Sequence, residues 1–172
     1  MTDAFLALVA DALAEAGRDV DVDADLLTID VASSAPGGRV LAVVRPLART
    51  VTFYAVHPRA VPPQALAAVC ELAVRATNDL FTAALELDLT TGAVAARCAV
   101  VLGDVEPPVE SLGGLLEAAV REAESTAAAY GDPVDAVVSG DRSPAQAAAD
   151  VRRAPLEALQ DEVAELGGGP AD

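Results

Sequence analysis

Residues 82–102 read TAALELDLTTGAVAARCAVVL, and two alternating runs in this stretch decide the fold. Three leucines, Leu85, Leu87 and Leu89, alternate with acidic residues, a pattern typical of a strand with one face in water. After the turn around Gly92, apolar residues again occupy every second position to the end of the stretch. The sequence therefore predicts a β-hairpin whose turn holds an even number of residues, two or four.

The register of this hairpin follows from the need to bury one face. Pairing Leu87 with Ala96 places both inside, and the same register places Glu86 beside Arg97 on the wet face. A slip of one residue would bury Arg97. Tyr54, on a neighbouring predicted strand, is expected to share this wet face. We therefore treat Tyr54, Glu86 and Arg97 as candidates for a partner-binding surface.

The composition indicates one aromatic-poor domain with, at most, an appendage. The chain has 172 residues, of which 53% are hydrophobic and only 3% are aromatic. A chain of this length can bury a core without disulfides or metals, and here that core must consist of Ala, Val and Leu.

The net charge of −16 bears on the partners that the protein can bind. Phosphate backbones and anionic lipids repel so acidic a chain, so we expect no nucleic-acid or membrane-surface binding. The simplest interpretation of the charge is that it keeps the protein soluble, and the alternative is that it attracts a cationic protein. An acidic N-terminus and the lack of an apolar run of about 18 to 20 residues predict a cytoplasmic protein without a membrane span.

Periodicity and turn residues outline the order helix, three strands, helix, two strands, helix. The predicted elements are a helix over 3–16, strands over 26–31, 39–45 and 50–57, a helix opened by Pro62 and Pro63, the hairpin, and a helix over 109–130. Asn78 is expected to supply a left-handed cap, and Gly131 and Pro133 to break the last helix before one more turn. This order predicts an α+β fold, with one five-stranded antiparallel sheet and helices on one face.

The character of the chain changes at Gly140, so we divide it into a domain over 1–139 and a C-terminal helical extension and tail over 140–172. Pro155 is predicted to begin the last helix. Apolar residues spaced three, four and three apart form a short seam in that helix: Leu156, Leu159, Val163 and Leu166. The seam serves either for packing back onto the same domain or for binding a second subunit or a partner helix.

Residues with catalytic or metal-binding chemistry are sparse. His57 is the single histidine of the chain and is interpreted as an ordinary strand-end residue. Cys70 and Cys98 are interpreted as small core residues, and a disulfide between them is not required. The sequence shows no zinc spacing, no phosphate-binding loop and no nucleophile elbow. We therefore predict no catalytic residues, no cofactor and no metal site.

One acidic stretch resembles a calcium loop. Asp19, Asp21, Asp23 and Asp30 fall at loop positions 1, 3, 5 and 12 after a predicted helix. However, Ala24 stands where the loop needs glycine, and Asp30 is shorter than the usual bidentate glutamate. We favour an acidic loop and strand over calcium binding, and titration with calcium would decide between them.

The order of elements resembles the YbjN-domain family, which has a fold like that of type III secretion chaperones. The resemblance is carried by the helix ending at Asn78, the strand over 85–88, Gly92, Arg97 on the return strand, the strand over 41–45 and the Leu115-Leu116 helix. The chain departs from the family by lacking aromatic residues in these strands and by adding helices after Gly140. The resemblance implies an α+β domain, often a homodimer, that binds other proteins and does no chemistry.

Three function hypotheses follow. The first is a non-enzymatic protein-binding module, chaperone-like or a regulatory adaptor, that acts as a homodimer. The second is an acidic immunity or inhibitor protein that neutralises a basic partner through salt-sensitive binding. The third is an unrecognised enzyme, which requires a pocket with converging Asp, Arg and Tyr side chains and shifted pKa values.

Overall fold

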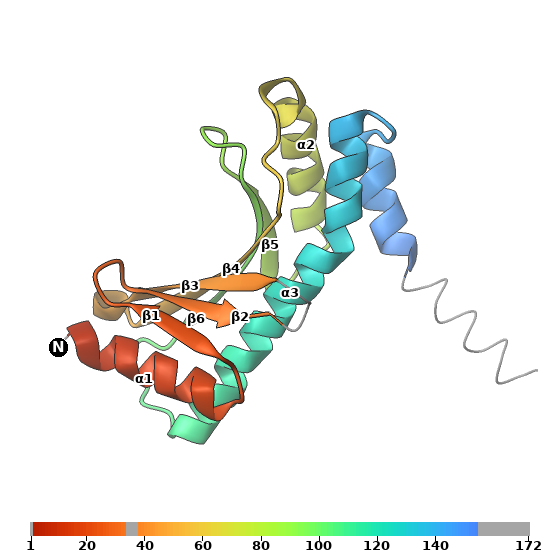
Figure 1. The fold of residues 1–172 in the computed structure, drawn as a ribbon. Helices are drawn as coiled ribbons and strands as arrows, with labels where there is room; N and C mark the ends of the chain where they lie inside the picture. The colour runs from red at the N-terminus through yellow and green to blue at the C-terminus, as the bar shows by residue number, and fades with distance from the viewer. Residues whose placement is uncertain (1, 34–37, 155–172) are drawn as a thin grey trace, which may run out of the picture.

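The structure, a computed structural model, describes residues 2–33 and 38–154 of the chain (Figure 1). The elements are the helices α1 (Thr2–Glu15), α2 (Leu66–Thr77) and α3 (Val109–Ser139), the strands β1 (Val20–Asp23), β2 (Thr28–Ala32), β3 (Arg39–Arg45), β4 (Thr50–Val56), β5 (Ala83–Leu87) and β6 (Val94–Val101), and the short 3-10 helices Pro46–Ala48 and Pro63–Ala65. Residues 144–154 are also helical. All pairings in the sheet are antiparallel, in the order β1-β2-β3-β4-β6-β5.

The α+β fold with one antiparallel sheet is confirmed, but the described residues form six strands and not five. The strand that sequence analysis missed is β1, a four-residue strand at the edge of the sheet whose last three residues are exposed. The predicted first strand also began too early, because Leu26 and Leu27 lie in the turn between β1 and β2. The Asp23 carboxylate accepts hydrogen bonds of 3.0 Å from the backbone N–H groups of Asp25 and Leu26 and so closes this turn.

The register predicted for the hairpin was wrong by two residues. Leu87 pairs with Val94 and not with Ala96. The predicted even loop length is right, because the Asp88 N–H donates to the Ala93 carbonyl oxygen at 2.8 Å and leaves residues 89–92 as the loop. The Asp88 carboxylate accepts hydrogen bonds from the threonines at the loop tip, and Leu89 is left 62% exposed in the loop. Since the shift is even, every inward residue stays on the inward face.

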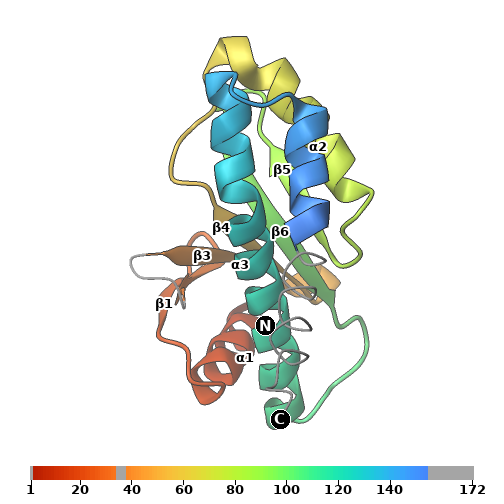
Figure 2. The ribbon, with the colours of Figure 1, turned by 90° about the vertical axis from the view of Figure 1, so that its right-hand side faces the viewer.

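The inward face of the sheet is covered by all the described helices, in two clusters (Figure 2). The first cluster joins α1 and the N-terminal half of α3 to β2, β3, β4 and β6, with Leu13, Ile29, Phe53 and Leu116 fully buried. The second joins α2, the C-terminal half of α3 and residues 144–154 to β5, with Leu72, Leu85, Tyr130, Val137 and Ala148 buried. Helix segregation to one face is therefore as predicted.

Helix α3 runs without a break through Pro133, contrary to the predicted break at Gly131 and Pro133. Proline removes one backbone hydrogen bond but does not end the helix here. Tyr130 and Val134 on either side of it are both buried in the second cluster, so tertiary packing holds the helix on both sides. Gly140, with a φ of 82°, provides the left-handed C-cap.

Two predictions for α2 were also wrong. Its buried residues Val69, Leu72, Ala73 and Ala76 follow a helical repeat that leaves Cys70 exposed, whereas Cys98 is buried as expected. Both cysteines are free thiols. Asn78 has a φ of −69° and continues in right-handed geometry, so it is not a left-handed cap.

Arg18 ties the start of the sheet to α3. Its Nε lies 2.7 Å from Glu117 Oε2 and its Nη1 lies 3.0 Å from Glu124 Oε1, and all three side chains are at most 16% exposed. The same Nη1 donates to the Ala32 carbonyl oxygen at 3.0 Å. Hydrogen bonds from Arg18 hold the pKa of Glu117 below its usual value, and the two carboxylates raise the pKa of Arg18.

Candidate protein-binding surface

The face of the sheet that points away from the helices carries none of the described helices, although the side chain of Thr52 at its centre is buried beneath its neighbours. Within residues 2–33 and 38–154, the helices pack on the opposite face, so none of them covers it (Figure 1). We define the outer face by the outward residues of β3 to β6: Arg39, Leu41, Val43, Arg45, Thr50, Thr52, Tyr54, Val56, Ala84, Glu86, Ala95, Arg97, Ala99 and Val101.

The structure brings the three sheet residues singled out from the sequence together on the outer face. Tyr54 on β4 pairs directly with Arg97 on β6. On β5, Arg97 pairs with Ala84, and its Nε donates a hydrogen bond to the carboxylate of Glu86, two residues beyond Ala84. The Arg97 and Glu86 side chains are 35% and 45% exposed, so both charges remain accessible to a partner.

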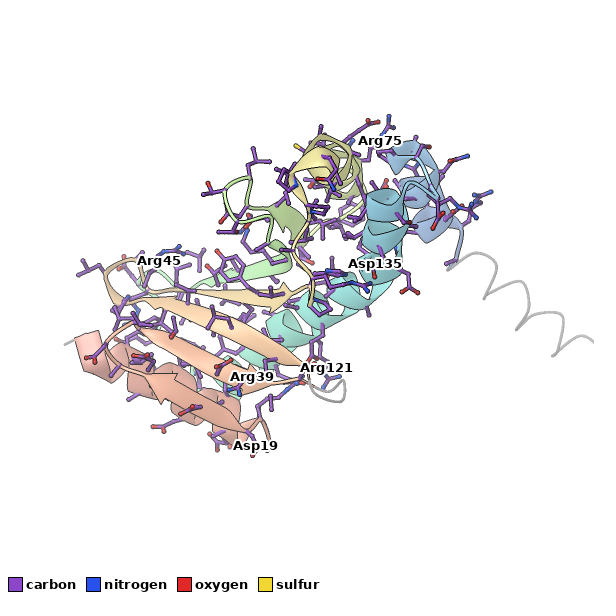
Figure 3. All side chains as sticks on the ribbon, turned by 45° about the horizontal axis from the view of Figure 1, so that its top comes forward. Asp19, Arg39, Arg45, Arg75, Arg121 and Asp135 are labelled. Atoms are coloured by element: carbon purple, nitrogen blue, oxygen red, sulfur yellow. The ribbon has the colours of Figure 1, made fainter. Side chains whose placement is uncertain are left out.

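Two further arginines of β3 also have partners on this side of the sheet. Arg45 Nη1 donates to Thr52 Oγ1 at 3.2 Å, and Arg39 Nε lies 3.0 Å from Asp30 Oδ1. Figure 3 shows Arg39 and Arg45 at opposite ends of β3. The arginines of the outer face are therefore held at defined positions around its centre.

Apolar side chains surround these polar groups. Val56 is 51% exposed and Val101 is 72% exposed, while Leu41 and Val43 are half-buried on the neighbouring strand. An aromatic residue and an arginine among exposed apolar residues form the composition typical of protein-protein interfaces. The outer face can bind a protein by contact and hydrogen bonding.

His57 has a partner that sequence analysis missed. Its Nε2 lies 3.5 Å from Asp135 Oδ1, and Arg59 also forms an ion pair with Asp135. Asp135 lies on α3 facing the connection after β4 (Figure 3). Residues 57 and 135 are far apart in the sequence, so no local pattern could predict this contact. Through Asp135, His57 and Arg59 attach the chain after β4 to α3.

The same residues border a small pocket of about 230 Å³ between the end of β4 and α3. Its lining combines apolar residues, among them Leu85 and Val94, with Tyr130 and the polar side chains of His57, Asp132 and Asp135. Burial and the neighbouring Asp79 carboxylate raise the pKa of Tyr130. The raised pKa keeps the phenol neutral at pH 7.

A second hollow, the α3–β6 groove, has a volume of about 300 Å³ and opens on the helix-bearing side. It is lined by Thr82, Cys98, Ala99, Val100, Leu115, Ala118, Ala119 and Glu122. Thr82 Oγ1 donates to Glu122 Oε1 at 2.8 Å across it. Burial raises the pKa of the Cys98 thiol, so this cysteine is a poor nucleophile.

The four aspartates that resemble a calcium loop lie on the β1–β2 hairpin, with Asp21 opposite Asp30. A hairpin does not present the ligand geometry of a loop between two helices. Asp23 is engaged in the turn and Asp30 in the contact with Arg39. Among the described residues, no group of three or more potential ligands is placed to hold a metal ion.

Part of the predicted partner surface cannot be placed. The seam residues Leu156, Leu159, Val163 and Leu166 lie outside the described residues. As for membranes, no helix in the described part of the chain has the length and apolar character needed to cross a bilayer.

Comparison with known proteins identifies the fold. No protein-family model matches the chain, and neither does any curated protein. Among solved structures, YbjN from E. coli, for which a role as a transcription regulator is suggested, matches with a TM-score of 0.55 and 10% identity over 70% of this chain and 86% of that chain. The HopA1–SchA chaperone–effector complex matches with a TM-score of 0.42 and 15% identity, over 67% of this chain and 86% of that chain. The protein has a YbjN-like fold, as the element order indicated.

Proposed function

We propose that the protein is a non-enzymatic protein-binding module, a chaperone-like or regulatory adaptor, that binds through the outer face of its sheet. The observation that carries this proposal is that Tyr54, Arg97 and Glu86 lie side by side on neighbouring strands of a sheet face that the described helices leave uncovered. The charged groups there are paired with one another, which suits recognition better than proton transfer.

The same face supports association of two copies. Arg97 and Glu86 place opposite charges side by side. A twofold axis through the face would bring the Arg97 of each copy to the Glu86 of the other, which is the self-complementarity that a symmetric dimer requires. We therefore propose a homodimer, and light scattering should give a molar mass near twice that of the monomer.

Charge reversal of Arg97 tests the proposal. Arg97→Glu places a second carboxylate beside Glu86, and a repulsion of about 1.4 kcal/mol weakens binding ten-fold. Capture of host proteins, or of a differently tagged second copy of the chain, should therefore fall at least about ten-fold. The matched control is Arg75→Glu on α2, which also removes a partly exposed arginine from an ion pair. Equal capture by the two variants would contradict binding through the outer face.

A second candidate function is neutralisation of a basic protein. Its support is the acidic β1–β2 hairpin, which carries Asp19, Asp21, Asp23, Asp25 and Asp30, in a chain with a net charge of −16. Binding of this kind should weaken steeply with added salt and upon changing Asp21 to Asn. A basic partner whose capture is unaffected by salt would rule this candidate out.

A further inference from the structure

The α3–β6 groove is an apolar surface without a cover in the described part of the chain. Leu115 at its border is 45% exposed, and Phe81, next to the lining residue Thr82, is completely exposed. Ala118 and Ala119 on α3 are small, so a neighbouring helix can approach closely here. Exposed apolar residues gathered beside a groove usually mark a binding site.

The described chain ends beside the C-terminal half of α3, on the helix-bearing side where the groove opens. Residues 144–154 run back alongside the C-terminal half of α3, as Figures 1 and 2 both show. Ala147 and Ala148 are buried in the second cluster, and Arg152 Nη1 lies 3.2 Å from Asp79 Oδ2. Val151 packs against the cluster that contains Tyr130, which places this end of the helix beside that part of α3.

The remaining chain has the length needed to reach the groove. From Tyr130 back to Leu115, α3 rises by about 22 Å, at about 1.5 Å per residue. The chain from Arg152 to Leu166 is long enough to cover this distance, because it spans about 21 Å even at the rise of a helix and more if it is extended around Pro155. An antiparallel arrangement would place Leu166 opposite Leu115 and Val163 close to Ala118.

Residues 155–172 also have the chemistry that the groove needs. Their sequence places Leu156, Leu159, Val163 and Leu166 on one predicted helical stripe, and every charged residue in the segment is acidic. The stripe suits an apolar groove, while the acidic side faces water.

We propose that residues 155–166 dock into the α3–β6 groove of the same chain, with the apolar seam facing Leu115, Ala118 and Ala119. A segment tethered within reach is present at an effective concentration in the millimolar range, which a second copy of the chain does not match at ordinary concentrations. The groove is then occupied by the protein's own C-terminal segment, and any other occupant must displace it.

Disulfide trapping tests this proposal in the full-length protein. In a Cys70→Ser, Cys98→Ala background, the pair Leu115→Cys and Leu166→Cys should form an intramolecular disulfide under mild oxidation. The matched control pairs Leu166→Cys with Val74→Cys, which lies on α2 and is 63% exposed. The groove pair should give at least ten-fold more intramolecular product than the control, as measured by mass spectrometry.

The other outcomes have distinct meanings. Disulfide-linked dimers from the groove pair would overturn the proposal and assign the groove to a second copy. Equal trapping in both pairs, or no trapping, would also overturn it. Circular dichroism confirms that each variant is folded, and a second pair, Ala118→Cys with Val163→Cys, guards against local disruption at Leu115.

Discussion

At the scale of single residues, Gly92 determines how the β5–β6 loop meets the chain that follows β4. Its φ of +75° lies in the left-handed region, and an added Cβ would overlap the Val61 carbonyl oxygen. The Gly92 carbonyl oxygen also accepts a hydrogen bond of 2.8 Å from the Val61 N–H. Only glycine allows both this backbone conformation and this close approach.

Gly92→Ala should therefore lower the free energy of unfolding by more than about 2 kcal/mol, because backbone strain and steric overlap add. Gly17→Ala is the matched control, since Gly17 has a φ of +89° with no atom near its missing Cβ. In Gly17→Ala only the backbone strain should lower the free energy of unfolding, by about 1 kcal/mol. Urea denaturation measures both, and equal losses would contradict the role of the Val61 contact.

Arg18 is the second residue whose loss has a defined consequence. Arg18→Met removes the cation shared by two largely buried carboxylates: Glu117 keeps its contact with Arg121, and Glu124 loses its ion pair with Arg18. Together these losses should cost about 2 to 4 kcal/mol at pH 7. The folded-state pKa of Glu117 is depressed below its ordinary value of 4.5. Its stabilising contribution is therefore present above pH 4.5 and is lost as the pH falls through the folded-state pKa.

The difference in stability between the wild-type protein and Arg18→Met should consequently shrink as the pH falls below 4.5. Urea denaturation at a series of pH values between neutrality and acid measures this difference. A gap that stays constant throughout the acid range would show that the ion pairs with α3 contribute nothing that depends on ionisation.

At the scale of elements, the helix over 144–154 belongs to the second cluster. Ala147 is 2% exposed and Ala148 is fully buried. Val151 packs against the same cluster, which also contains Tyr130 and Val137. This packing makes the helix a cover for the C-terminal half of α3.

A version of the chain ending at Ser139 should therefore unfold at a lower temperature than the full chain, with a loss of about 2 kcal/mol from the apolar area it exposes. Ala148→Asp in the full chain should have a similar effect, because it buries a carboxylate. Scanning calorimetry measures both. An unchanged melting temperature in the shortened chain would contradict the role of this helix as part of the core.

At the scale of the whole molecule, alternation and turn residues in the sequence sufficed to predict the fold class and the shared face of Tyr54, Glu86 and Arg97. The pattern within a single strand shows which residues share a face, because inward and outward positions alternate strictly. Strand β1 escaped prediction because its exposed, acidic residues resemble a loop. The register of the hairpin was misjudged because the Asp88 carboxylate accepts hydrogen bonds from Thr90 and Thr91 and so centres the turn on these two threonines.

Contacts between distant segments were beyond the sequence patterns. The His57–Asp135 contact joins a strand end to a helix, and the α3–β6 groove forms where α3 crosses β6. Pro133 illustrates the same limit, since only the packing of Tyr130 and Val134 explains why the helix continues. Local preference was overruled by tertiary packing at that position.

Binding through the outer face is tested most directly by photo-crosslinking from Tyr54. Replacing Tyr54 with benzoylphenylalanine keeps an aromatic ring at the centre of the face, and Val74, 63% exposed on α2, is the control position. Irradiation in host extract should give covalent adducts with protein at position 54, of twice the monomer mass if the partner is a second copy, and none at position 74. Adducts at position 74 alone, or at neither position, would contradict binding through the outer face.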